Sequence, residues 1–161
     1  MLNITLSVFL IVALFLIYEG FRNGLVSKAI SFVILFILGL VFVVAAVFLN
    51  AYLSGSTMNV IVGAILFVLL LTLHRVLSVL YVNTKLAKKL GEPNVLFRIL
   101  GAVLGICEAV LILWTVYGIM GALSMGEVAA RVEMETVNTP VLKQLYDFNL
   151  LEMIVRALPI A

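Results

Sequence analysis

The sequence predicts an all-α integral membrane protein with four transmembrane helices and a short extracytoplasmic amphipathic helix near its C-terminal end. Of the 161 residues, 65% are hydrophobic and only 11% are charged. A soluble core of this size cannot bury so many apolar side chains. The apolar residues form long stretches divided by short polar or glycine-containing connections, and charges become frequent only after Ser124. We therefore expect a membrane domain over residues 1–123 and a tail over 124–161.

Composition also excludes several functional classes. The formal charge of +2 is small and dispersed, which argues against a nucleic-acid partner. Cys107 is the single cysteine, so neither an intrachain disulfide nor a cysteine-cluster metal site can form. The HExxH, GxSxG and Walker motifs are absent, and we expect no enzyme, metal or cofactor. The expected surroundings are the lipid bilayer and protein partners, and the sequence leaves open whether a small-molecule ligand binds.

The four spans are expected at about residues 2–18, 29–49, 60–82 and 97–123. The first two are joined by a tight interfacial turn that contains Gly20, Phe21, Arg22 and Gly24. An uncharged connection over 50–59 follows the second span. The third span continues with helix-forming residues to Leu90, before Gly91 and Pro93. A helix over 60–90 would measure about 46 Å, so its basic end should leave the membrane.

The tail is expected to carry one interfacial helix over about 140–158. Thr139 and Pro140 are a typical cap and first residue of a helix. Two oppositely charged pairs at i,i+4 spacing follow, Lys143 with Asp147 and Glu152 with Arg156. Four charges within this stretch favour a helix that lies on the membrane surface over one that crosses it.

Orientation follows from the distribution of lysine and arginine. Seven of these residues flank the first turn and the connection between spans three and four: Arg22, Lys28, Arg75, Lys85, Lys88, Lys89 and Arg98. The opposite side has Arg131, Lys143 and Arg156. The positive-inside rule makes the first side cytoplasmic, which places both termini outside a bacterial cytoplasmic membrane.

The last expected span carries a carboxylate, Glu108, in its apolar interior. At 100° per residue, Glu108 lies about 20° from Gly101 and about 60° from Gly105. Gly105 and Ala109 follow Gly101 at four-residue intervals, and Arg98 lies at the entrance of the span. Small residues allow another helix to approach closely in lipid. We therefore expect protein to cover this face.

An ionisable group at that depth needs a partner or a water-filled cavity. Lys28 and Arg75 are the two candidate partners, and the favoured interpretation is an ion pair that fixes helix register. A proton or ion relay, a substrate contact, a water-filled groove and contact with another subunit are the alternatives. His74 is expected to be hydrogen-bonded or to face headgroups, with a relay as the alternative. Ser27, Ser31, Thr72 and Ser78 are expected to bond only to local helix carbonyls.

Three stretches resemble the colicin V production protein family, CvpA. Gly20-Phe21-Arg22-Asn23-Gly24 is similar to the family's RGFxRG turn. Arg98-Ile99-Leu100-Gly101 with Gly105 is similar to its DRxLGxxxG entrance to the last span, and residues 138–159 are similar to its short extracytoplasmic tail. The order and spacing of these motifs extend the resemblance over nearly the whole chain.

The chain departs from the family pattern at four charged positions. Glu19 stands in place of an arginine, Lys28 in place of an acid, Phe97 in place of an aspartate and Glu108 in place of a basic residue. The paired reversal at Lys28 and Glu108 retains an attraction between the second and fourth spans. It thus favours the ion-pair interpretation.

The resemblance implies a cytoplasmic-membrane protein linked to colicin V-like toxin production or export and to envelope homeostasis. It implies no enzymatic activity. Our first hypothesis is a non-enzymatic scaffold that acts as a homo-oligomer or with membrane-protein partners, through the glycine face of the last span. The second is a small channel or transporter with a pathway past Glu108. A sealed Glu108 favours the first hypothesis, and a Glu108 open to water favours the second.

Overall fold

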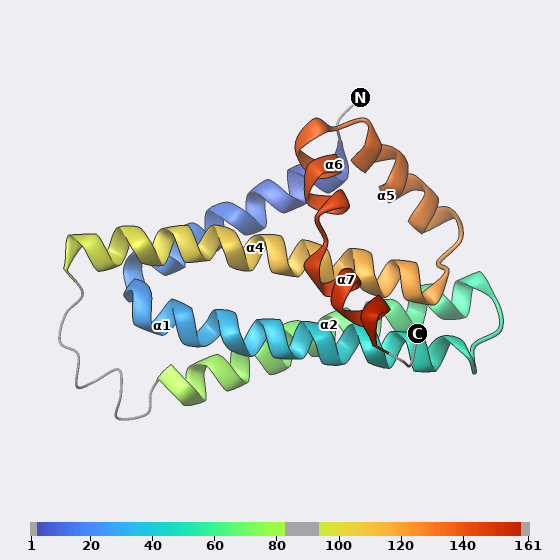
Figure 1. The fold of residues 1–161 in the computed structure, drawn as a ribbon, viewed down its shortest axis with the longest axis horizontal. Coiled ribbons are helices and arrows are strands. Elements are labelled where there is room, and N and C mark those ends of the chain that lie inside the picture. The colour runs from blue at the N-terminus through green and yellow to red at the C-terminus, as the bar shows by residue number, and fades with distance from the viewer. Residues whose placement is uncertain (1–2, 83–93, 159–161) are drawn as a thin grey trace.

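The computed structural model describes residues 3–82 and 94–158 (Figure 1). All its regular elements are helices, which confirms the all-α class. They are α1 (Ile4–Asn50), α2 (Ser56–Val82), α4 (Val95–Leu123), α5 (Glu127–Val137), α6 (Pro140–Asp147) and α7 (Leu150–Ala157). The first three are long and apolar enough to cross a membrane. The count of four crossings stays a prediction, and so does any helix beyond Val82, because the stretch 83–90 lies outside the described residues.

Helix α1 consists of two helical segments that meet at Gly24. Gly24 has φ 78° and ψ 175°, a conformation that favours glycine, and it is the non-helical residue inside α1. The helix therefore continues through most of the expected turn and reverses at a single residue. In Figure 1 the first segment runs toward the left and the second returns toward the right. We call residues 4–23 the first segment and residues 25–50 the second segment.

Helix α4 packs against both segments of α1. Its N-terminal half runs antiparallel to the first segment, with Gly101 against Gly20 and Gly105 against Leu16. Its C-terminal half runs parallel to the second segment, since Thr115 contacts Gly39 and Val43 contacts Gly118. The main apolar core lies between the second segment, α2, α4 and α7, and its buried residues include Leu35, Val43, Leu70, Leu111, Leu123 and Leu151.

The tail forms three short helices where we expected one over 140–158. Phe148 and Asn149 interrupt that stretch, and the Asn149 side chain caps α7 by accepting a hydrogen bond from the Glu152 N–H at 3.2 Å. Asn149 is also held in place because its amide donates to the Trp114 carbonyl at 3.2 Å. The helix breaks here because the asparagine is needed as a cap and as a bridge to α4.

The tail helices lie against the side of the long helices. Leu151 and Val155 of α7 are buried and belong to the main core. The Trp114 indole N–H donates to the Leu145 carbonyl at 2.6 Å, and the hydroxyl oxygens of Tyr117 and Thr136 are 2.9 Å apart. Figure 1 shows α7 crossing α4 and the second segment of α1. The tail thus braces the bundle.

Candidate functional site: a buried charge network

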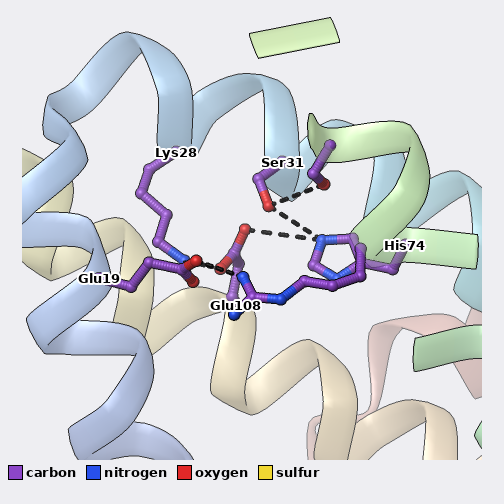
Figure 2. A network of polar contacts seen from close by, with 7 residues as sticks. Glu19, Lys28, Ser31, His74 and Glu108 are labelled. Carbon is purple, nitrogen blue, oxygen red and sulfur yellow. Dashed lines mark hydrogen bonds and ion pairs between the residues drawn. The ribbon is translucent and has the colours of Figure 1, made fainter. Parts of the chain in front are cut away.

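The charge network is centred on Glu108, which α4 places in the interior with no exposed surface. Its Oε2 atom is bonded to the Lys28 ammonium, which comes from the second segment of α1. The same ammonium donates to Glu19 Oε2 at 3.1 Å, and Glu19 belongs to the first segment (Figure 2). Because the side chain of Lys28 is 3% exposed, the ion pairs are shielded from water. One lysine therefore joins the two segments of α1 to α4.

The second helix enters this network through Arg75. Its guanidinium bonds to Glu19 Oε1, so the two oxygens of Glu19 hold two different cations. The guanidinium also lies over the Phe15 ring, 5.6 Å from its centroid. The side chain of Arg75 is 54% exposed. An exposed pair of this kind contributes little stability in water.

His74 lies one residue before Arg75 and points into the interior. Its Nε2 atom is 2.9 Å from Ser31 Oγ, and Ser31 Oγ is 3.3 Å from Ser78 Oγ. The same Nε2 is 4.0 Å from Glu108 Oε1, which is too long for a hydrogen bond. Glu108 Oε1 has no hydrogen-bond partner among the described residues. The imidazole and the carboxylate therefore face each other without a bond.

A small polar pocket adjoins this network between α1 and α2. Its volume is about 110 Å³. It is lined by Glu19, Asn23, Ser27, Lys28, Ser31, Ser78 and Val79. Glu108 is not part of the lining, since Lys28 and Ser31 lie between the pocket and the carboxylate. The pocket can hold a few water molecules next to the network.

The structure brings together most of the residues that the sequence indicated. Lys28 rather than Arg75 contacts Glu108, and His74 has the hydrogen-bonded environment that we favoured. Glu19 is a central member that sequence reasoning treated only as a departure from a motif. Little in the sequence indicated this role, because the direction of the Glu19 side chain depends on the geometry of the turn that follows it.

The expectation for the serines was wrong at two positions. Thr72 does bond to the Val68 carbonyl at 2.8 Å, four residues back. Ser31 and Ser78 instead bond to each other across two helices and, through Ser31, to His74. Spacing could have shown this, because Lys28 and Ser31 are three residues apart, and His74 and Ser78 are four apart. Residues at these intervals share one helix face.

The glycine face of α4 is covered by the same chain. A methyl group added at Gly101 would overlap the Gly20 carbonyl, and one at Gly105 would overlap the Leu16 carbonyl. Ala109 is buried in a cluster with Ala13 and Leu16. The expectation that this face binds another subunit is therefore wrong, because the first segment of α1 fills it. Among the other motif residues, Phe21 and Arg22 are exposed and Arg98 is partly buried.

Metal ligands do not gather at this site in the described part of the chain. No group of three or more histidine, cysteine, aspartate or glutamate side chains there could hold an ion. The cations of the network are instead the ammonium of Lys28 and the guanidinium of Arg75, which are built into the chain.

Comparison with known proteins shows the family of the chain. The sequence profile of a family described as colicin V production protein matches residues 7–145. The chain belongs to the colicin V production protein family. The match extends from the first segment of α1 to α6 and therefore includes every member of the charge network. Comparisons with curated proteins and with solved structures found no match.

Proposed function

We propose that this multi-pass protein is a non-enzymatic scaffold of the bacterial cytoplasmic membrane, of the CvpA type. It supports the production or export of a colicin V-like toxin and envelope homeostasis. The observation that carries the proposal is the sealed contact between Lys28 and Glu108. A carboxylate without exposed surface, held by a lysine that is itself 3% exposed, is suited to locking helices together.

The scaffold acts as an oligomer or in a complex with other membrane proteins. Because the glycine face is filled within the chain, its partners bind elsewhere, and much apolar surface is available on α2. Ile65, Val68, Leu80 and Tyr81 are exposed there. We further propose four crossings, with the two segments of α1 as separate spans and both termini outside.

A charge exchange tests the scaffold role. In a bacterium that lacks the gene, the variants Lys28→Glu, Glu108→Lys and the double variant are compared for folded protein in the membrane, toxin export and envelope integrity. A scaffold needs only the attraction, so the double variant should restore folding and phenotype better than either single variant; restoration is partial because the new carboxylate at position 28 also faces Glu19. If the double variant folds at the wild-type level but restores neither export nor envelope integrity, the scaffold role is wrong.

The second candidate function is a small channel or transporter with a pathway past Glu108. The polar pocket between α1 and α2 favours it, because water there comes within one side chain of the carboxylate. Reconstitution in vesicles tests it by ion or proton flux. Flux that is lost in Glu108→Gln, with folding unchanged, would support this function over the scaffold.

A further inference from the structure

The unpaired oxygen of Glu108 and the imidazole of His74 face each other across a short gap. Both groups can bind a proton. Both side chains are buried, with His74 7% exposed. The atoms Glu108 Oε1 and His74 Nε2 are 4.0 Å apart. We propose that they bind one proton together, and that the proton reaches them through the polar pocket between α1 and α2. This inference is independent of the scaffold role proposed above.

The network offers an added proton one acceptor that has no partner, Glu108 Oε1. The charged groups that act on His74 are Glu108 from α4 and Lys28 and Glu19 from α1, and Arg75, the next residue of α2, bonds to Glu19. Two carboxylates and two cations cancel when the imidazole is neutral. An added proton makes His74 a cation, and the acceptor without a partner is Glu108 Oε1. A shift of about 1 Å would bring the two atoms to the distance of a charge-assisted hydrogen bond.

Ser31 provides the matching change in hydrogen bonding. When the imidazole is neutral and its proton is on Nδ1, the Ser31 hydroxyl donates to Nε2, 2.9 Å away. When Nε2 gains a proton it becomes a donor, and the Ser31 hydroxyl can turn to Ser78, 3.3 Å away. The imidazole then directs its new N–H toward Glu108. No bond to carbon forms or breaks, and the proton comes from water in the pocket and returns there.

The weak attachment of α2 allows this movement. Only 17% of the most apolar stretch of α2 is buried, against 39% for α4. The helix is joined to α1 at this end by the contacts of His74, Arg75 and Ser78. Proton binding therefore draws α2 toward α4, while α4 itself stays fixed by its close contact with α1.

The single histidine makes the proton directly observable. The full chain is labelled with ¹⁵N-histidine in lipid nanodiscs, and the two ring-nitrogen shifts are followed between about pH 5 and 8. We expect one titration, in which both nitrogens become protonated as the pH falls. Absence of a titration over this range would overturn the proposal.

Variants at position 108 test whether the carboxylate shares the proton. Glu108→Gln removes the charge that stabilises the imidazolium, so the doubly protonated fraction of His74 at about pH 5 should fall several-fold. Glu108→Asp keeps a negative charge for Lys28 but moves the carboxylate oxygen away from His74, so protonation of His74 should fall by less. If Glu108→Gln does not fold, Glu108→Asp is the variant that tests the shared site. Glu135→Gln is the control. Glu135 lies in α5 and bonds to Thr5 at the start of α1, far from His74, so its loss should leave the titration of His74 unchanged. A titration in Glu108→Asp identical to the wild type would refute the shared site.

The route through the pocket has its own test. Ser78→Leu fills the pocket and should reduce magnetisation transfer from water to the His74 ring several-fold. Thr72→Leu adds the same side chain to an exposed position on the same helix, and it should leave the transfer unchanged. Equal transfer in both variants would show that the proton takes another route.

Discussion

Helices α4 and α2 both pack against α1, but they are held there by different physical means. At the end of the bundle near Gly24, α4 is fixed by shape, because Gly101 and Gly105 bring its backbone against the backbone of α1. At the same end, α2 is held mainly by polar contacts from His74, Arg75 and Ser78. At its other end the Asn59 amide bonds to the Leu123 carbonyl of α4. At the end near Gly24, α4 should therefore be most sensitive to added size at Gly101 and Gly105, and α2 to the loss of its polar contacts.

The largest expected effect comes from enlarging the glycine face. Gly101→Ile or Gly105→Ile places a branched side chain where a carbonyl of α1 already lies, so the folded yield in membranes should fall severely. Thermal unfolding in detergent measures the loss in any protein that folds. Gly121→Ile is the matched control, because nothing lies within 4 Å of a methyl group added there. Gly118→Ala should be intermediate, since it meets only the side chain of Val43. Equal folded yield of the isoleucine variants at positions 101 and 121 would show that close backbone contact does not fix α4.

The next effect comes from breaking the buried ion pair. Glu108→Ala leaves Lys28 with only the partly exposed Glu19, and it should destabilise the protein by about 3 kcal/mol. Glu108→Gln should recover much of this loss, since an amide oxygen can still accept from the ammonium. Thermal stability in detergent is the measurement. Glu127→Ala, an exposed acid at the start of α5, is the control and should cost far less. Equal stability of the Ala and Gln variants would show that hydrogen bonding to Lys28 is unimportant.

A smaller effect is expected from the serine bridge between α1 and α2. Ser31→Ala removes the contacts with His74 and Ser78, at a cost of about 1 kcal/mol. Because α2 has few other attachments here, the loss should also loosen α2 locally. Hydrogen exchange of its backbone amides near Ser78 reports this. Thr72→Val, which loses only a bond within its own helix, should leave exchange unchanged. Matching exchange in the two variants would mean that apolar packing alone holds α2.

The smallest effect concerns the pH dependence of a contact at the start of the first segment. The Thr5 backbone N–H and hydroxyl donate to Glu135 Oε2 at 2.8 and 2.7 Å, and they lower the pKa of Glu135 below its ordinary value. A lowered folded-state pKa contributes stability above the unfolded pKa, and this contribution is lost as the pH falls through the folded value. Unfolding midpoints measured from neutral to acidic pH should therefore fall less in Glu135→Gln than in the wild type. Parallel curves would exclude this contribution.

Sequence reasoning reached further for α4 than for α2. The four-residue spacing of Gly101, Gly105 and Ala109 predicts a closely packed face, because steric demands are local and periodic. It could not say that α1 would fill that face, since the partner depends on the reversal at Gly24. Likewise, the expected depths of Lys28 and Arg75 in the membrane did not show which of them would contact Glu108. Only the rotation of each helix about its axis separates them, and apolar residues on all sides give no hydrophobic face from which to infer it.

The tail shows a second limit. Charges at i,i+4 spacing indicated a helix over 140–158, and the pairing of Arg156 with Glu152 at 2.5 Å is present in α7. The break at Asn149 was hidden, because its reason lies in α4. An asparagine that caps one helix and bonds to the carbonyl of another cannot be distinguished by local propensity from one on a helix surface.

Gly24 also bears on how the chain enters a membrane. A straight helix as long as α1, 47 residues, would measure about 70 Å, more than twice the hydrocarbon thickness. With the reversal, residues 4–50 form a hairpin of two shorter segments, each of them closer in length to that thickness. A single backbone angle near the start of the chain thus sets the direction in which the second segment runs past α4.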